Sequence, residues 1–273
     1  MASDVKKIGL IAGNKLLPLL IAKSIKTNFK NYSLTVICFK NETDRRITQY
    51  ADRVFWVSPG KLTALSNSVA ASGITEWMMA GQVNPLKIFN RRNWDCEFEK
   101  IAGQVMDMCP HSILYAIIEY LQGYGAKFLD STLFLKDTLA HEGNISGVEI
   151  GTHTRADIEF GINLARKYVE LDVGQTVIVK NKTAVALECI EGTDIAIRRA
   201  HRLAGKECIV IKFCTESHDF RFDVPVVGMK TLYLLKKTKS AALILPANRV
   251  IILEKDRFIR YAKENGIPVI GII

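Results

Sequence analysis

The sequence contains no apolar run long enough to cross a membrane. Its longest apolar stretches, such as residues 8–12 and 241–246, are much shorter than the ~20 residues that a spanning helix requires. The amino terminus has no apolar core followed by a small-residue cleavage site, so a signal peptide is not predicted. These absences predict a protein that remains in the cytoplasm.

Paired metal and redox motifs are also missing. The six cysteines show no short paired spacing of the zinc-ribbon or thioredoxin type, and we interpret them as reduced core residues. The five histidines form no His-Glu-x-x-His pattern. Gly205-Lys206 is followed by Glu207 and lacks an upstream glycine at phosphate-loop spacing. No Gly-x-Ser-x-Gly elbow is present, although a dispersed catalytic triad stays open.

Positive charge is in excess, with 37 Lys and Arg against 28 Asp and Glu and a net charge of +9. Such an excess favours nucleic acid, an anionic membrane surface or a phosphorylated substrate as partner. The basic residues are scattered, and they are not interleaved with aromatic residues as a nucleic-acid groove would require. We therefore expect no nucleic-acid partner.

The first half alternates strand-like and helical segments. An apolar run from residue 7 ends at Gly13, and a helical pattern containing Leu17 and Pro18 follows. Alternation of this kind predicts an α/β fold with a Rossmann-like parallel sheet in the amino-terminal domain. Further strands are expected at residues 34–39, 53–57, 76–80 and 127–129, and helices at residues 61–72, 97–108 and 112–121.

A glycine after the first strand is typical of nucleotide-binding units, in which the backbone approaches phosphate. Only Gly13 stands where a dinucleotide fingerprint needs three glycines, which disfavours a dinucleotide dehydrogenase. A glycine that merely turns the chain is the alternative interpretation.

Residues 143–154 are rich in Gly, Asn, Ser and Thr, which predicts a boundary between a domain at residues 1–146 and a second, mixed α/β domain at residues 147–273. Thr154 and Asp157 predict a capping box at the start of a helix that runs to about residue 169. A hairpin is expected from residues 176–179 and 184–190, with further strands at residues 208–213 and 250–253.

Three carboxylates lie within residues 188–194, where a strand-like run passes through a glycine into a predicted helix. Thr193 is a good helix cap, and Glu191 and Asp194 suit the positive end of the helix dipole, so a purely structural role is one interpretation. Glu188 fits that role less well, because a carboxylate on so apolar a strand should be exposed, paired or bound to a ligand. Oxygen ligands of this kind suit Mg²⁺, and both interpretations stay open.

Residues 219–228 alternate apolar and charged side chains. The alternation predicts a strand with Arg221 and Asp223 on one face and Phe220, Phe222 and Val224 on the other. A structural ion pair, or charges that keep an edge strand soluble, is one interpretation. In the other, Arg221 binds phosphate oxygens and Asp223 ligates a metal or activates water.

Motifs spread over nearly the whole chain carry a family resemblance. The first half contributes residues 8–13 with Leu17-Pro18, residues 80–83, residues 129–137 and Glu142-Gly143. The second half contributes residues 171–177, residues 188–194 with Arg198-Arg199, Lys212 and residues 221–228. In this order, the motifs resemble the LpxI family, the UDP-2,3-diacylglucosamine hydrolases of lipid A biosynthesis in Gram-negative bacteria.

The resemblance implies Mg²⁺-dependent hydrolysis of the diphosphate of UDP-2,3-diacylglucosamine to UMP and 2,3-diacylglucosamine 1-phosphate. It implies a catalytic role for Asp223, which we expect to act with Arg221, and we expect Asp223, Glu191 and Asp194 to ligate the metal. The residues expected to contact substrate are Gly13, Leu17, Gly81, Gln82, Gln175, Glu188, Gly192, Thr193 and Lys212.

The implied partners are the UDP-linked diacyl sugar and the inner-membrane surface, which a cytoplasmic protein would contact peripherally; a homo-oligomer stays open. The basic residues 236, 237 and 239 follow an apolar segment, which suits either bilayer contact or an ordinary strand end. Two rival hypotheses remain. One is a non-catalytic or altered-specificity binder of a nucleotide-linked lipid sugar, and the other is a nucleotide-sugar transferase or oxidoreductase.

Overall fold

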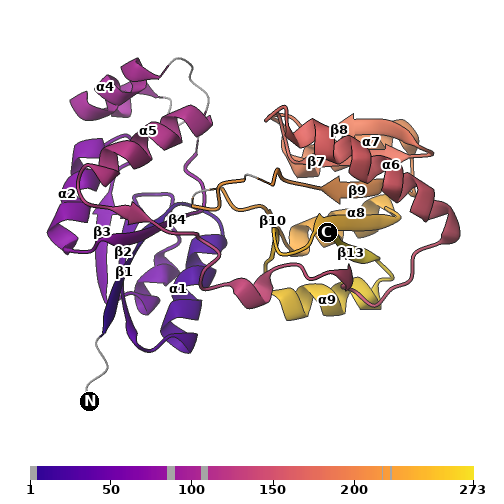
Figure 1. The fold of residues 1–273 in the computed structure, drawn as a ribbon, viewed down its shortest axis with the longest axis horizontal. Helices are drawn as coiled ribbons and strands as arrows, with labels where there is room; N and C mark the ends of the chain where they lie inside the picture. The colour runs from indigo at the N-terminus through magenta and orange to yellow at the C-terminus, as the bar shows by residue number, and fades with distance from the viewer. Residues whose placement is uncertain (1–4, 85–89, 106–109, 217, 222) are drawn as a thin grey trace. The chain divides into compact units, whose positions relative to one another are not determined.

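The computed structural model describes residues 5–84, 90–105, 110–216, 218–221 and 223–273. These residues divide into two compact units (Figure 1). The first contains the chain up to Leu135 together with Asp219–Asp223, and the second contains Lys136–His218 and Val224–Ile273. Each unit has its own sheet and its own core.

The described strands of the first unit form a parallel five-stranded sheet of order β3-β2-β1-β4-β5. Residues 8–12 of β1 are buried, as expected for a parallel sheet that helices cover on both faces. This confirms the predicted Rossmann-like amino-terminal sheet. The strands are β1 (Lys6–Ala12), β2 (Tyr32–Phe39), β3 (Arg53–Val57), β4 (Glu76–Ala80) and β5 (Lys127–Phe128).

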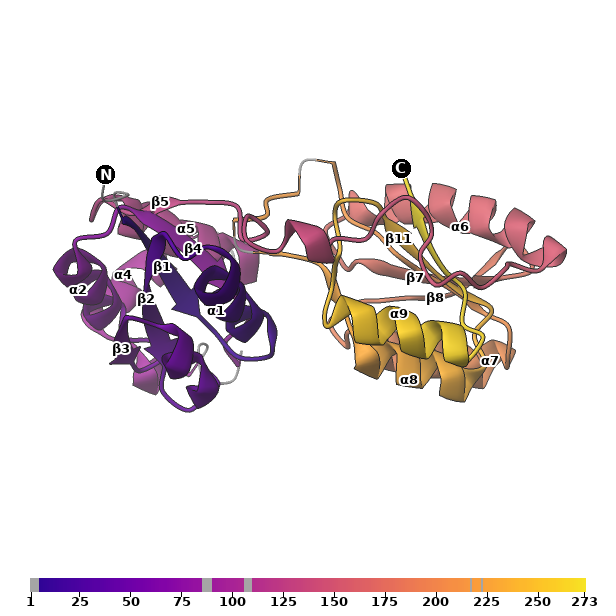
Figure 2. The same ribbon diagram turned by 90° about the horizontal axis from the view of Figure 1, so that it is seen from below.

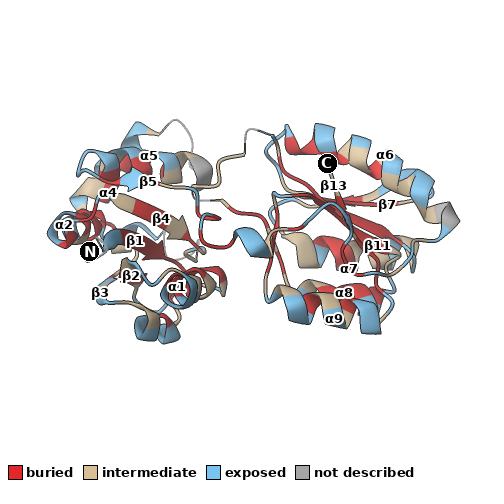
Figure 3. Ribbon diagram, turned by 60° about the horizontal axis from the view of Figure 1, so that its bottom comes forward, coloured by how far each residue is buried: buried red, intermediate tan, exposed pale blue. Residues whose placement is uncertain are grey.

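Helices lie on both faces of this sheet (Figure 3). α1 (Leu17–Asn28) covers one face, and α2 (Leu62–Ser72), α4 (Cys96–Gln104) and α5 (Pro110–Gln122) cover the other. Ile11, Ile37 and Trp77 point from the strands into the core beneath α2, α4 and α5. The short 3₁₀ segments are η1 (Arg45–Tyr50) and η2 (Arg91–Asn93), with η3 (Lys136–Thr138) at the start of the second unit.

Six of the described strands form the mixed sheet of the second unit, in the order β6-β13-β11-β9-β7-β8. β9, β11 and β13 run parallel, while β7 is antiparallel to both of its neighbours and β6 is antiparallel to β13. The strands are β6 (Gly143–Asn144), β7 (Thr176–Lys180), β8 (Thr183–Leu187), β9 (Ile209–Lys212), β11 (Ala242–Pro246) and β13 (Val269–Ile272). β10 (Val226–Val227) and β12 (Ile251–Ile252) form a separate parallel pair.

The second sheet lies between two helical layers (Figure 2). α6 (Thr152–Val169) covers one face, where Tyr168 and Val169 pack beside Val177 and Ile211. The other face is covered by α7 (Thr193–Ala204), α8 (Met229–Thr238) and α9 (Lys255–Glu264). The predicted mixed α/β second half is therefore confirmed. No helix in the described part of the chain is long and apolar enough to span a bilayer.

The second unit departs from the sequence prediction at the start of α6. The helix begins at Thr152, with Gly151 as its cap and no side-chain capping bond, so the predicted capping box of Thr154 and Asp157 is wrong. The Asp157 carboxylate instead accepts hydrogen bonds from the backbone N–H groups of Asn181 and Lys182, each at 2.7 Å. Its role is to fix the β7–β8 turn against α6, because those two amides have no partner in a strand ladder at the turn.

Two further differences concern boundaries. Contacts divide the units between Leu135 and Lys136, ahead of the expected 146/147 boundary, and β6 at Gly143–Asn144 already pairs with β13 of the second sheet. The basic residues 236, 237 and 239 lie at the carboxyl end of helix α8, so their interpretation as a strand end is wrong.

Candidate active site

Gly13 and Gly81 bring two loops together at the carboxyl edge of the first sheet. They follow β1 and β4, the neighbouring strands at which the order of the sheet reverses, and Gly81 has a φ of 83°. A Cβ atom on Gly13 would lie 2.4 Å from the Gln82 carbonyl oxygen, and one on Gly81 would lie 2.4 Å from the Asn14 carbonyl oxygen. Glycine thus permits the backbone bond from Asn14 N to Gln82 O at 2.6 Å. Reversal points of this kind are the usual ligand crevices of open α/β sheets.

Leu17 and Asn14 lie in the loop and helix start beside these glycines. Leu17 is buried as the first residue of α1, next to Pro18 in the first turn. The Asn14 side-chain amide donates to the Glu42 carboxylate at 2.6 Å, and the same carboxylate oxygen accepts the backbone N–H of Asn84 at 3.0 Å. The structure therefore brings Gly13, Gly81 and Gln82 together and fixes the loop after β2 beside them.

Arg221 and Asp223 lie in a turn rather than in a strand. The backbone N–H of Asp223 donates to the carbonyl of Asp219 at 3.4 Å, and β10 begins only at Val226. The expected strand over residues 219–228 is therefore wrong for the residues that the structure describes, and Phe222 lies outside them. The Asp219 carboxylate accepts the Arg221 backbone N–H at 3.0 Å, a local bond that competes with extended strand structure.

The same aspartate pairs with the Arg221 side chain. The Nε and Nη2 atoms of Arg221 donate to the two carboxylate oxygens of Asp219 at 2.5 to 2.9 Å. The hydrogen bonds that Arg221 donates to Asp219 raise the pKa of Arg221, so the guanidinium stays charged. The predicted shared strand face of Arg221 and Asp223 is thus replaced by a compact turn, whose contacts place it in the first unit.

A hydrogen-bonded chain joins Lys212, Thr193 and Glu188 at one end of the second sheet. Lys212 ends β9, Thr193 begins α7 and Glu188 follows β8. The Lys212 ammonium donates to the Thr193 hydroxyl at 3.4 Å, and that hydroxyl donates to Glu188 Oε1 at 2.9 Å. The Thr176 hydroxyl, at the start of β7, lies 3.2 Å from the Thr193 hydroxyl. Three of the expected substrate-contact residues therefore meet here.

These hydrogen-bonded polar groups are largely buried, which is unusual for charged side chains. Lys212 is only 7% exposed. The Oε2 atom of Glu188 is buried and has no hydrogen-bond partner among the described residues. A buried charged oxygen without a donor is costly, so a donor on a bound ligand would stabilise it. Glu188 thus marks a position where a hydroxyl or amine of a ligand fits.

Gln175 and Gly192 lie beside the same elements. Gln175 precedes β7, and its carbonyl accepts the backbone N–H of Phe213 at 2.7 Å. Gly192 caps α7 with a φ of 82°, a conformation that favours glycine. Thr193 is therefore the first helical residue and not the cap that the sequence predicted. Its hydroxyl is directed to Glu188 instead of to the helix amides.

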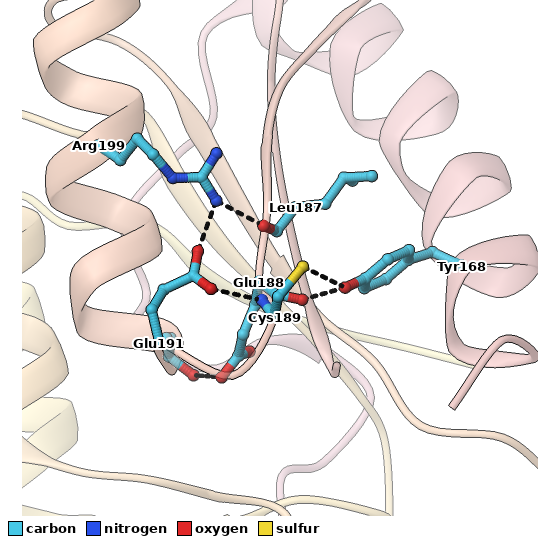
Figure 4. A network of polar contacts seen from close by, with 7 residues as sticks. Tyr168, Leu187, Glu188, Cys189, Glu191 and Arg199 are labelled. Atoms are coloured by element: carbon cyan, nitrogen blue, oxygen red, sulfur yellow. Dashed lines mark hydrogen bonds and ion pairs between the residues drawn. The ribbon is translucent and has the colours of Figure 1, made fainter. Parts of the chain in front are cut away.

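Tyr168 and Arg199 hold the loop that follows β8 (Figure 4). The Tyr168 hydroxyl donates to the Glu188 carbonyl and lies 4.0 Å from the Cys189 sulfur. Burial, and then the contact with Cys189, raise the pKa of Tyr168 to about 12. Arg199 donates to the Leu187 carbonyl at 2.7 Å. These contacts orient the backbone that carries Glu188.

Glu191 and Asp194, the expected metal ligands of this segment, each face a cation. Glu191 pairs with Arg199 at 2.5 Å and accepts the Cys189 backbone N–H at 3.0 Å. Backbone hydrogen bonding first, and then Arg199, lower the pKa of Glu191. Asp194 pairs with Lys230 at 2.8 Å. No three His, Cys, Asp or Glu residues in the described ranges lie close enough together to hold a metal ion.

This donor set does not fit a preformed three-carboxylate metal centre. Mg²⁺ often binds through one or two carboxylates plus substrate phosphate oxygens, an arrangement that needs no such cluster. A contribution of Asp223 to a metal site therefore stays a prediction, and so do those of Glu191 and Asp194.

Several residues of the two sites were not predicted from the sequence. They are Thr176, Tyr168 and Lys230 in the second unit and Ser131 in the first. Each acts across elements that are distant in the sequence, such as α6 with the loop after β8, so no local spacing could reveal them. Weak signals existed for Ser131 and Thr176, which lie within the motifs at residues 129–137 and 171–177.

Comparison with known proteins agrees with this two-unit arrangement. The model of the LpxI N-terminal domain matches residues 7–138, and the model of the LpxI C-terminal domain matches residues 141–270. The chain belongs to the LpxI family. A curated relative, the UDP-2,3-diacylglucosamine pyrophosphatase LpxI of Caulobacter vibrioides, is 22% identical over 284 aligned positions, which cover 98% of each chain. This assignment within the LpxI family supports a hydrolase.

Proposed function

We propose that this LpxI-family protein hydrolyses the diphosphate of UDP-2,3-diacylglucosamine, releasing UMP and 2,3-diacylglucosamine 1-phosphate. The observation that carries the proposal is the end-to-end match to both LpxI domain models and to a relative named for this activity. A substrate with two acyl chains resides in a membrane. The protein would therefore work in the cytoplasm at the surface of the inner membrane.

The second unit offers groups suited to the anionic and sugar parts of such a substrate. Lys212 supplies a buried positive charge, and the amino-terminal amides of α7 have no side-chain cap to compete with a ligand oxygen. Glu188 Oε2, which lacks a donor within the described chain, would accept a hydrogen bond from a sugar hydroxyl. These features support a phosphate-bearing, hydroxyl-rich ligand.

In the first unit, Asp223 would accept a proton from the attacking water, and Arg221 would stabilise charge on phosphoryl oxygens. The bonds from Arg221 to Asp219 fix the guanidinium plane, which supports this proposed role. Bound Mg²⁺, held by Asp223 together with substrate oxygens, would add electrostatic stabilisation of the phosphoryl group. No covalent intermediate is required for direct attack by water.

The activity is tested by incubating pure protein and UDP-2,3-diacylglucosamine with Mg²⁺ and measuring UMP release, with and without chelator. We expect release that the chelator abolishes, and an Asp223→Ala variant that binds substrate but loses at least ~100-fold in kcat. Asp256→Ala, an exposed aspartate of α9, serves as the matched control and should keep full activity.

Near-normal turnover by Asp223→Ala would show that Asp223 is not a catalytic residue. Ligand retention without any UMP would favour a binding protein instead. The same assay with substrate in phospholipid vesicles tests whether the protein acts at a membrane surface.

A further inference from the structure

Ser131 connects the turn that carries Asp223 to the end of the central strand β4. Its backbone N–H donates to the Phe220 carbonyl at 2.9 Å. Its hydroxyl lies 3.0 Å from the Arg221 carbonyl and 2.6 Å from the Met79 carbonyl. Ser131 has no exposed surface, so water does not compete for these bonds.

The register of β5 explains why a hydroxyl is needed here. The N–H of Lys127 donates to Thr75 O, and the N–H of Leu129 donates to Trp77 O at 2.8 Å. Continuation of this parallel ladder would direct the Ser131 N–H to Met79 O. The Ser131 N–H instead donates to Phe220, and the hydroxyl of the same residue donates to Met79 O in its place.

A separate contact turns the Ser131 amide away from the ladder. The Asp130 carboxylate accepts the Thr132 N–H at 2.7 Å and the Thr132 hydroxyl at 2.6 Å, which bends the chain directly after Leu129. Because of this bend, the Ser131 hydroxyl reaches Met79 of the sheet while the Ser131 N–H reaches Phe220 of the turn. An alanine at this position would keep the amide bond to Phe220 and lose the bonds of the hydroxyl.

We propose that Ser131 is a positioning residue that fixes the Arg221–Asp223 turn relative to the carboxyl end of β4. Two residues after Met79 the chain reaches Gly81, so Ser131 sets the distance between the turn and the loop of Gly81 and Gln82. The proposal rests on the proposed function, because it treats Asp223 as the catalytic group. In this role Ser131 contacts neither the attacking water nor the phosphate. Ser131 acts only by holding the backbone of the turn that carries Asp223.

The test compares Ser131→Ala with Ser24→Ala in the full chain. Ser24 is a matched control because its hydroxyl donates to the Phe134 carbonyl at 2.6 Å, which binds α1 to the same loop without contacting the turn. We expect Ser131→Ala to lower kcat about 10-fold or more with KM changed by less than ~2-fold, because small misplacement of reacting groups is costly. Ser24→Ala should keep kcat, and Ser131→Thr, which restores a hydroxyl, should recover it.

Hydrogen exchange supplies a readout that does not depend on activity. Amide exchange in the peptide that spans residues 219–223 should accelerate in Ser131→Ala and not in Ser24→Ala. If the alanine variant does not fold, Ser131→Cys, which keeps the volume with a weaker donor, replaces it in both measurements.

Unchanged kcat in a folded Ser131→Ala enzyme, or an equal loss in Ser24→Ala, would overturn the positioning role. Failure of the proposed function looks different, since wild-type protein would then release no UMP. In that case the exchange comparison still decides whether Ser131 holds the turn.

Discussion

At the scale of single residues, the two candidate sites depend on polar groups in dry surroundings. Lys212 and Ser131 are both buried, and Glu188 Oε2 has no donor within the described chain. Such groups reduce stability unless hydrogen bonds or a ligand offset their desolvation. Their presence at the ends of strands, where ligands bind in α/β sheets, is the residue-level support for a binding function.

Tyr168 provides a residue-level test through pH. Its pKa is raised from 10.0 to about 12 in the folded protein, so the folded state holds this proton more tightly than the unfolded chain. The contribution of this tighter proton binding to the free energy of unfolding is fully present below pH 10 and is lost as the pH rises toward 12. In Tyr168→Phe, we expect about 1 kcal/mol lower stability at neutral pH, from the lost hydrogen bond, and a shallower decline above pH 10.

The measurement is urea unfolding of both proteins between pH 8 and about pH 11, within the range that the pKa shift defines. Tyr233→Phe, a change at an exposed tyrosine of α8, is the control for general effects of losing a phenol. Parallel declines for wild type and Tyr168→Phe would contradict the raised pKa that burial gives Tyr168.

At the scale of elements, the β7–β8 hairpin shows how a helix and a turn stabilise each other. Asn181 and Lys182 both have positive φ, 50° and 52°, which is the conformation of a type I′ turn. Asp157 of α6 holds both of their amides. Asparagine tolerates this backbone, whereas lysine adopts it at a cost.

Replacing Lys182 by glycine should therefore stabilise the protein. The change creates the favoured Asn-Gly turn and relieves the left-handed strain, for an expected gain of about 0.5–1 kcal/mol after the entropy cost of glycine. Chemical unfolding measures the gain. The control is Thr183→Gly, one residue later in β8, which should destabilise the protein because glycine weakens a strand. Stabilisation of the protein by both changes would contradict the turn argument.

At the scale of the whole molecule, the first unit is discontinuous in sequence. Residues 219–223 lie inside the second half of the chain but make their contacts in the first unit. A fragment of residues 136–273 therefore contains the strands of the second sheet together with this turn. It lacks Ser131, whose bonds to Phe220 and Arg221 hold the turn in the full chain.

Trypsin should cleave after Arg221 at least ~10-fold faster in that fragment than in the full chain, because a segment without packing partners opens more readily. Mass spectrometry over a digestion time course measures both rates. Cleavage after Arg166 in α6 reports whether the fragment has folded, and it should proceed equally in both proteins. Equal rates after Arg221 would show that the turn needs no partner from the first unit.

The sequence predicted most of the first unit because its signals are local. The apolar run before Gly13, the helix at Leu17 and the regular alternation of strands and helices are each visible within a short window. In the second unit, β11 and β13 and the helices α8 and α9 were not predicted. β11 is buried throughout, and every residue of β13 is apolar or glycine, so neither sequence alternates apolar with polar residues and periodicity cannot separate these strands from helix.

The residues of the candidate sites divide in the same way. The sequence by itself determined the α/β class, the family resemblance and the likeness of residues 188–194 and 221–228 to functional motifs, because these depend on residue order. Only the tertiary structure decided that Arg221 pairs with Asp219 in a turn, that Lys212 reaches Glu188 through Thr193, and that Ser131 joins the turn to β4. The Lys212 and Ser131 contacts join residues from separate elements, so packing of the sheets sets the partners and spacing along the chain does not. The Arg221 contact is local, but it forms only because the chain turns at Asp219 where an extended strand was expected.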